Sequence, residues 1–438
     1  MNFAVRGIVA GIAVVGFVVS ALVGMFQAGV IFPPALGTTP AVRVSGELSA
    51  LFSVPRSTFM PLATGLTPTP PMGWNGYNHF SRAVTAATVE AAARALVSSG
   101  MKAAGYNYVN LDGGWDLPRR NAGGTLQPDP TKFPQGIRPL ADYVHSLGLK
   151  FGIYTSAGIE NCAGTTAGSY GHYRLDAATF ASWGVDYIKL DWCYVPYRSL
   201  PHTTHRQLDE MLAMQMGYAL AVTGRAIVFD VNNPANNQPR SSSGGLANLW
   251  RTTTDIKDTY PGMLVNFTHN VNQYKRGPSG WNDPDMLEIG NGGMSTTEYQ
   301  SQLSLWAEMA APLIAGNDLT TMSGATRSIL TNLAVIAVDQ DRLGQQGYPV
   351  ASANGHWVLT KPLANGDRAV LLFNQTNASA TISTTVTQVG LTSPGDYTLL
   401  NLWSGAATET AGVITASVPP HSVVFYGIAK SVTRPFRT

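Results

Sequence analysis

Short apolar runs alternate with amphipathic stretches through the middle of the chain. Four runs have the pattern of buried strands: residues 108–112 (YVNLD), 150–154 (KFGIY), 185–191 (VDYIKLD) and 226–230 (AIVFD). Between them lie helical patterns such as residues 88–97, where Val89, Ala93 and Leu96 share one face. Strand–helix alternation of this kind predicts a parallel sheet. About eight such units fit between residues 72 and 341, so we expect an α/β fold with a closed (β/α)8 barrel.

The pattern changes after residue 347. Short runs rich in Val, Thr, Leu and Ile follow one another, including residues 356–360 (HWVLT) and 368–373 (RAVLLF). Turn signals such as Asn-Gly-Asp at residues 365–367 separate them. This predicts a C-terminal antiparallel β-sandwich over residues 346–430, after a barrel over residues 71–345.

The N-terminus has the features of an export segment. Arg6 precedes an uncharged apolar run over residues 8–26, which is about 19 residues and also long enough to span a bilayer. Residues 35–37 (ALG) form only a weak cleavage site. We therefore expect residues 1–32 to be a signal peptide or a membrane anchor, and the protein to be secreted or anchored outside the cell. Residues 33–70, rich in Pro, Thr, Ser and Ala, read as a linker.

The composition of the chain argues against nucleic-acid binding and metal binding. Charged residues make up only 12% of the 438 residues and the net charge is +2, which argues against a nucleic-acid partner. The eight histidines are scattered without the spacing of metal ligands. We expect no metal and no cofactor, and the sequence does not predict an oligomeric state.

Acidic residues follow several of the predicted strands, at the end where barrel enzymes carry their catalytic residues. They are Asp112, Asp191, Asp230, Asp255, Asp283 and Asp285. The surrounding sequence contains aromatic residues that could pack on sugar rings: Trp74, Tyr77, Trp115, Tyr154, Trp192 and Trp281. Carboxylates among aromatic side chains are typical of a sugar pocket. Glycoside cleavage with retention needs one carboxylate nucleophile and one acid/base about 5–5.5 Å apart, but the residues alone do not choose the pair.

Several long motifs, in order, resemble glycoside hydrolase family 27, the α-galactosidase or melibiase family. They are PMGWN (71–75), LQPDP (126–130), FPQGI (133–137), GLKFGIY (148–154), WGVDYIKLDWC (183–193), WNDPDML (281–287), APLIAGNDL (311–319) and DQD (339–341). The resemblance runs from about residue 70 into the predicted sandwich. It implies a barrel followed by a sandwich and a retaining α-glycosidase that uses two aspartates.

The resemblance also assigns catalytic roles. Asp191 stands where the family has its nucleophile. Lys189 lies two residues earlier on the same face of the strand, so it is expected to bind sugar hydroxyls and to keep Asp191 ionised. The family's Arg-x-x-x-Asp motif is Arg251 to Asp255, so Asp255 is the expected acid/base and Arg251 a sugar ligand. Asp258 is the nearest rival for the acid/base role.

Further residues are expected around the sugar or in the framework. Asp112, Tyr77, Trp115, Tyr154 and Asp285 complete the expected substrate-binding set, with Asp285 at the back of the pocket. The two cysteines of the chain, Cys162 and Cys193, match a disulfide pair of the family.

Three departures bear on specificity. Gly113 follows Asp112 where the galactose enzymes have a second acid, Tyr77 stands where an indole is usual, and residues 230–234 (DVNNP) lack the galactosidase acid and aromatic. Losing one carboxylate costs about 1.5–3 kcal/mol of charge-assisted hydrogen bonding to the sugar. Gly113 could alternatively be required for a positive φ.

Three functions therefore remain open. The first is hydrolysis of terminal α-linked galactose in an oligo- or polysaccharide. The second is hydrolysis of another glycoside, such as an isomaltose-releasing activity on α-1,6-glucan or cleavage of β-L-arabinopyranosides. The third, a non-catalytic sugar-binding barrel, is disfavoured because Asp191, Asp255, Lys189 and Arg251 are all retained.

Overall fold

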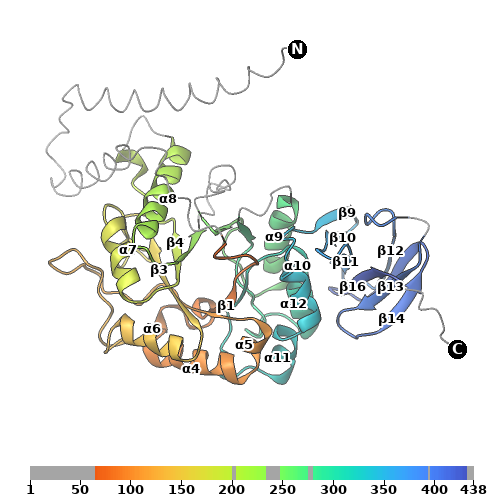
Figure 1. Ribbon diagram of the computed structural model, residues 1–438, viewed down its shortest axis with the longest axis horizontal. Coiled ribbons are helices and arrows are strands. Elements are labelled where there is room, and N and C mark those ends of the chain that lie inside the picture. Colours follow the sequence, from red (N-terminus) through yellow and green to blue (C-terminus); the bar gives the residue numbers. More distant parts are fainter. Residues whose placement is uncertain (1–64, 200–203, 233–246, 275–279, 393–394, 432–438) are drawn as a thin grey trace, which may run out of the picture. The chain divides into compact units, whose positions relative to one another are not determined.

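The computed structural model describes residues 65–199, 204–232, 247–274, 280–392 and 395–431 (Figure 1). The expected signal or anchor, most of the expected linker, and residues 233 and 234 of the loop after the fifth strand lie outside these ranges.

Eight parallel strands form one curled sheet in the order β7-β6-β5-β4-β3-β2-β1-β8. The strands are β1 (Met72–Asn75), β2 (Tyr108–Leu111), β3 (Lys150–Ser156), β4 (Tyr187–Asp191), β5 (Val228–Asn232), β6 (Leu249–Arg251), β7 (Trp281–Asp283) and β8 (Leu313–Ala315). The sheet closes just beyond β7, where Leu287 pairs with Ala315 and its N–H donates to the Ile314 carbonyl at 2.8 Å. The predicted barrel is confirmed.

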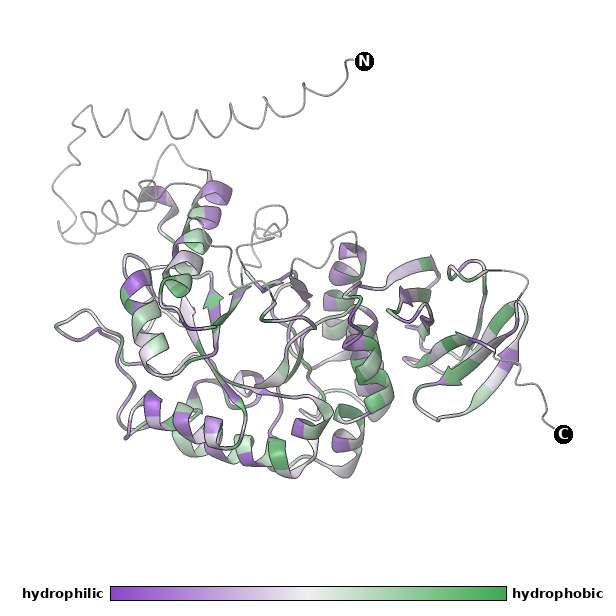
Figure 2. Ribbon diagram, in the orientation of Figure 1, coloured by the Kyte–Doolittle hydropathy of each residue, from purple (hydrophilic) through white to green (hydrophobic). Residues whose placement is uncertain are grey.

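Helices follow most of the barrel strands along the chain. They are α3 (Tyr77–Phe80), α4 (Ala86–Ser98), α5 (Met101–Ala104), α6 (Ile137–Ser146), α7 (Tyr173–Ser182), α8 (His205–Ala221), α9 (Tyr260–Asn270), α10 (Thr296–Glu308), α11 (Gly324–Leu330) and α12 (Leu333–Asp339), with single 3-10 turns at Ser81–Ala83, Tyr197–Ser199 and Val271–Gln273. The helices carry both hydrophobic and hydrophilic residues (Figure 2). Helix α4 buries the predicted Val89, Ala93 and Leu96, because positions three and four apart share a helix face.

The C-terminal part is antiparallel, as predicted. Strands β9 (Tyr348–Ala353), β10 (His356–Pro362), β11 (Arg368–Asn374), β13 (Tyr397–Asn401), β14 (Ala407–Thr410) and β16 (Val423–Lys430) form a sheet in the order β14-β13-β16-β11-β10-β9. Strands β12 (Ala380–Thr385) and β15 (Val413–Val418) form the second sheet.

Strand β11 is buried on both faces. Ala369, Leu371 and Phe373 belong to the hydrophobic core of the barrel. The alternate residues Val370 and Leu372 belong to the core of the sandwich, as the two-residue period of a strand requires. This is why the sequence of β11 is a continuous apolar run rather than an alternating one.

Three ionisable residues are fully buried where β10 approaches the ends of two barrel helices. Lys361 on β10 donates to the Ala307 carbonyl at 3.1 Å. Glu308 ends α10 and Asp339 ends α12, and both are buried. Burial raises the pKa of Glu308 to about 8 even though the Lys361 charge opposes the rise.

Candidate active site

The parallel register brings the predicted site residues to the same end of the barrel. Lys189 pairs with Tyr154 on β3 and with Asp230 on β5, and Asp191 is the last residue of β4. On the neighbouring pair of strands, Arg251 at the end of β6 pairs with Asp283 at the end of β7. Because carboxyl ends of parallel strands meet at one rim, side chains distant in sequence converge there.

Asp112, directly after β2, is the centre of a buried polar cluster. Its Oδ2 accepts hydrogen bonds from Lys189 Nζ at 2.9 Å and from Asn75 Nδ2 at 2.6 Å, and its Oδ1 accepts from the Gly113 N–H at 2.7 Å. Burial raises the pKa of Asp112, but Lys189 and these hydrogen bonds outweigh it and hold the pKa below its usual value. Asp112 is therefore an ionised acceptor that can bind a sugar hydroxyl.

Asp191 lies next to a positive charge and a sulfur atom. Burial raises the pKa of Asp191 to about 6, with Lys189 opposing the rise and Asp112 adding to it. Its Oδ2 lies 3.1 Å from Sγ of Cys162. A carboxylate with this pKa is ionised at neutral pH, as a nucleophile must be.

Tyr154 links the loop after β3 to Asp191. Its hydroxyl accepts the Cys162 N–H at 3.3 Å, and its ring lies 5.6 Å from the Lys189 ammonium. Burial and the charges of Asp191 and Asp112 raise the pKa of Tyr154 well above its usual value, so the hydroxyl stays neutral. A neutral phenol can donate to Asp191 and hold its orientation.

Arg251 binds two carboxylates on the side of the site formed by β6 and β7. Its Nη1 donates to Asp255 Oδ1 at 3.0 Å and to Asp285 Oδ2 at 2.8 Å. Arg251 is only 3% exposed, whereas the Asp255 side chain is 87% exposed. Asp285 also accepts the Ile256 N–H at 2.7 Å. The buried Asp285 thus fixes both Arg251 and the loop that follows Asp255, and Asp255 itself faces the open side where a leaving group can reach it.

Two other predicted acids have supporting positions. Asp230 is buried and accepts a hydrogen bond from the Tyr187 hydroxyl at 2.8 Å. Burial, reinforced by the Asp283 charge, raises the pKa of Asp230 to about 8, so it is protonated at neutral pH. Asp258, the rival acid/base, accepts hydrogen bonds from the Gly293 N–H and the Tyr299 hydroxyl. It anchors a loop, which leaves Asp255 as the accessible acid on this side.

The prediction that Trp115 binds substrate is wrong. Trp115 is 1% exposed, its Nε1 donates to the Tyr154 carbonyl at 2.9 Å, and its ring packs edge-on against Trp183. No face of this indole is available to a sugar. Trp74 and Trp281 are buried as well. Tyr77 is partly exposed on α3, immediately beyond β1, and remains at the rim.

The predicted disulfide between Cys162 and Cys193 is present and closes a loop across 31 residues. It joins the loop after β3 to the residues after β4. The bridge therefore lies against Asp191, whose Oδ2 is 3.1 Å from Sγ of Cys162.

Two polar residues of the site were missed from the sequence. Asn75 ends β1 and donates to Asp112, and Asn232 ends β5 opposite Asp191 in the strand register. Both could have been found, because each is a polar residue at the carboxyl end of an apolar strand. Among the residues that the structure describes, no group of three or more His, Cys, Asp and Glu is arranged to hold a metal.

Family profiles and sequence relatives of this chain point to the same family. Residues 69–341 match the profile of alpha galactosidase A, and residues 353–428 match the alpha galactosidase C-terminal beta sandwich domain. An α-galactosidase of Oryza sativa subsp. japonica is 42% identical over 364 residues, covering 83% of this chain and 85% of the relative. Human alpha-galactosidase A is 37% identical over 386 residues, covering 82% and 83%.

Solved structures agree with the sequence relatives. The crystal structure of α-galactosidase I from Mortierella vinacea superposes with a TM-score of 0.79 at 33% identity, covering 84% of this chain and 99% of the other. A β-L-arabinopyranosidase from Geobacillus stearothermophilus has a TM-score of 0.74 at 25% identity, covering 85% and 98%. The family profiles, the sequence relatives and the solved structures agree: this chain is a glycoside hydrolase and belongs to the α-galactosidase family.

Proposed function

We propose that this protein hydrolyses terminal α-linked galactose from oligo- or polysaccharides with retention of configuration. The observation that carries the proposal is the position of Asp191. It ends β4 beside Lys189, whose ammonium bonds Asp112 at 2.9 Å, in a chain 42% identical to a plant α-galactosidase. The Lys189 ammonium thus acts on two carboxylates: Asp191, which reacts, and Asp112, which binds the sugar.

In the first step Asp191 attacks the anomeric carbon, and the bond to the leaving oxygen breaks while Asp255 gives that oxygen its proton. The product is a covalent glycosyl ester on Asp191. Lys189 keeps Asp191 ionised before the attack, since a nearby cation favours the charged carboxylate. Arg251 holds Asp255 by its Oδ1 and leaves the rest of that carboxyl group exposed.

In the second step a water molecule attacks the same carbon. Asp255, now a carboxylate, takes a proton from the water, and Asp191 leaves as a free carboxylate. Two inversions at one carbon return the original anomeric configuration. Neither step requires a group beyond these two acids and water.

The test is hydrolysis of 4-nitrophenyl α-D-galactopyranoside followed by proton NMR of the released sugar. The α-anomer of galactose should appear first and then equilibrate with the β-anomer. Initial release of the β-anomer would contradict retention. Isomaltose oligomers and a β-L-arabinopyranoside belong in the same screen, because faster turnover of either would contradict the assignment of galactose.

We also propose that the chain is exported. Arg6 and the apolar run over residues 8–26 support a signal or anchor, and the Cys162–Cys193 bridge suits an oxidising compartment. No helix within the described ranges has the length and hydrophobicity needed to span a membrane. Fractionation of cells that express the full chain tests this: activity in the soluble cytoplasmic fraction alone would contradict export.

A further inference from the structure

His421 of the sandwich contacts two helices of the barrel. It lies in the turn between β15 and β16, and its side chain is 26% exposed. Its Nδ1 lies 2.7 Å from Oε1 of Glu298 on α10. Its ring stacks on that of Tyr260 on α9, with 3.9 Å between the ring centroids and 15° between the planes. On the sandwich side, Nε2 lies 2.6 Å from Oδ1 of Asn377. One imidazole therefore joins the sandwich to the first turns of α9 and α10.

Glu298 also fixes the N-terminus of α10. Its Oε2 accepts the Ser295 N–H at 2.7 Å, and Ser295 Oγ accepts the Glu298 N–H at 3.3 Å, which is a capping box. Burial raises the pKa of Glu298, but the Ser295 N–H and His421 outweigh it and lower the pKa. The carbonyl of His421 accepts the Ser301 hydroxyl at 2.7 Å. The start of α10 is thus held by both the side chain and the main chain of His421.

The loop that carries Asp255 ends where Tyr260 begins α9. Within residues 255–259, which we call the acid/base loop, Asp258 accepts a hydrogen bond from the Tyr299 hydroxyl at 3.0 Å. Tyr299 lies near the start of α10. The acid/base loop is therefore attached to the first turns of the same two helices that the sandwich imidazole contacts.

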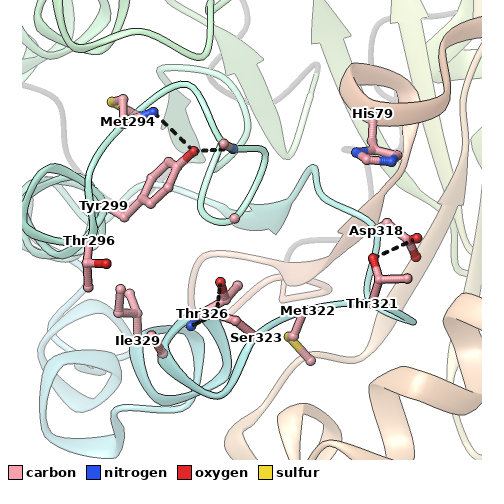
Figure 3. A pocket seen from close by; sticks show the side chains of 13 residues that line it. His79, Met294, Thr296, Tyr299, Asp318, Thr321, Met322, Ser323, Thr326 and Ile329 are labelled. Carbon is pink, nitrogen blue, oxygen red and sulfur yellow. Dashed lines mark hydrogen bonds between the residues drawn. The ribbon is translucent and has the colours of Figure 1, made fainter.

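Tyr299 connects α10 to the loop that precedes it. Its hydroxyl accepts the N–H groups of Gly292 at 2.6 Å and Met294 at 3.3 Å (Figure 3). The Gly293 N–H between them donates to Asp258 at 2.6 Å. Tyr299 also lines a pocket of about 310 Å³ beside α11, whose other walls come from the loops after β1, β7 and β8. A shift of the start of α10 would therefore reach the acid/base loop through both Tyr299 and Gly293.

We propose that His421 is a positioning residue: it holds the starts of α9 and α10 so that the acid/base loop keeps Asp255 where it can protonate the leaving oxygen. The inference rests on the proposed function, because it takes Asp255 as the acid/base. The Asp255 side chain is 87% exposed, so its position depends on the hydrogen bond from Arg251 and on the backbone of the loop. The sandwich thus contributes to catalysis through its contact with the barrel.

The test separates positioning of the acid from a general loosening of the two domains. A dinitrophenolate leaves without a proton, whereas methoxide needs one from Asp255, so dinitrophenyl and methyl α-galactosides place different demands on the acid. His421→Asn removes the imidazole, and asparagine tolerates the positive φ of 55° at this position. Trp403→Phe is the matched control, because it removes another hydrogen bond between sandwich and barrel, from Trp403 Nε1 to Ser304 Oγ further along α10.

In His421→Asn, kcat/KM should fall about tenfold on methyl α-galactoside and stay unchanged on the dinitrophenyl substrate, because a displaced acid slows only the reaction that needs its proton. Trp403→Phe should keep the wild-type ratio of the two values. Equal kcat/KM losses on both substrates in His421→Asn, no loss on either, or the same selective loss in Trp403→Phe would overturn the proposal.

Tyr260 tests the contact from the barrel side. Among the residues that the structure describes, its hydroxyl has no hydrogen-bond partner, so the stacked ring is what joins it to His421. Tyr260→Leu should reproduce the selective loss on methyl α-galactoside, and Tyr260→Phe should retain the wild-type ratio. A Tyr260→Leu variant with the wild-type ratio would show that the stack does not position the loop.

A measurement without substrate separates this proposal from the proposed function. Hydrogen exchange of the Ile256 N–H, which donates to Asp285 at 2.7 Å, reports on the acid/base loop directly. By mass spectrometry, this segment should exchange about tenfold faster in His421→Asn than in wild type, and at the wild-type rate in Trp403→Phe. Unchanged exchange in His421→Asn refutes the positioning role even in an active enzyme. If wild type hydrolyses neither galactoside, the proposed activity fails, whereas faster exchange in His421→Asn would still support the contact.

Discussion

The Nζ atom of Lys189 on β4 donates a 2.9 Å hydrogen bond to Oδ2 of Asp112 after β2, across the intervening strand β3. Asp191, two residues after Lys189, lies on the same face of β4. The ammonium therefore acts on both carboxylates, holding the pKa of Asp112 down and limiting the rise in the pKa of Asp191. One charge therefore influences the ionisation of both carboxylates.

This relationship predicts the pH profile. Burial raises the pKa of Asp191 to about 6, and the nucleophile must be ionised, so kcat/KM should fall as the pH drops through about 6. In Lys189→Met the opposing positive charge is gone, so the pKa of Asp191 should rise and the acid limb should move to higher pH. Lys150→Met, on the exposed start of β3, is the control. An acid limb that stays in place in Lys189→Met would contradict this account.

Replacing the nucleophile should abolish turnover. Asp191→Asn keeps the size of the side chain and removes the attacking carboxylate, so kcat should fall by roughly 10⁴-fold with little change in Tm. Asp142→Asn, at an exposed position on α6, should leave kcat unchanged. Activity of Asp191→Asn within tenfold of wild type would disprove the role of Asp191.

Gly113 can be replaced by aspartate without backbone strain. Its φ is not positive, and a Cβ would lie 3.4 Å from Cε1 of Tyr154, an ordinary contact. The alternative that Gly113 needs a positive φ is therefore wrong, and that conformation belongs to Gly114, whose φ is +100°. Gly113→Asp should fold, and it should raise kcat/KM on α-galactosides about tenfold if the added carboxylate bonds the sugar in the transition state.

Gly114→Asp is the natural comparison. Its Cβ would lie 2.9 Å from Cα of Arg82, and its positive φ disfavours any side chain, so Tm should drop. Gly113→Asp could instead have a normal Tm and an unchanged or lower kcat/KM on α-galactosides. In that case Gly113 does not weaken galactose binding, and another group makes the hydrogen bonds that the second acid makes in the family.

The disulfide should contribute to both stability and activity. A bridge that closes 31 residues is worth about 3–4 kcal/mol in the chain-entropy account. Cys193→Ala should lower the free energy of unfolding by this order. It should also reduce kcat, because Cys162 contacts Asp191 Oδ2 at 3.1 Å and its N–H orients Tyr154. Denaturant unfolding and initial rates measure the two effects, and full kcat in the variant would show that the bridge acts on stability alone.

The buried Glu308 should make the protein less stable as pH rises. Burial raises its folded-state pKa from 4.5 to about 8, so the folded state binds more protons than the unfolded state between these values. The free energy of unfolding should therefore fall from pH 5 to pH 8, by at most about 1.4 kcal/mol per pH unit from this group. Glu308→Gln should flatten the slope, whereas Glu90→Gln, at a partly exposed position on α4, should retain it. Equal slopes in wild type and Glu308→Gln would refute the prediction.

The sequence by itself determined the architecture, and it predicted which aspartates react. Strand and helix periods are local properties, so the alternation between residues 72 and 341 was enough to predict eight parallel units, and motif order assigned Asp191, Asp255 and the cysteine pair. The fold class, the family and the disulfide are confirmed.

Only the tertiary structure decided which side chains face the site. The sequence predicted that Trp115 and Tyr154 both contact the sugar, but packing against Trp183 buries the first, while the second interacts with Asp191. Local sequence does not encode that choice, since it depends on residues brought together by barrel closure. The same holds for the pocket beside α11, whose walls come from the loops after β1, β7 and β8 and become neighbours only when Leu287 pairs with Ala315 and closes the barrel.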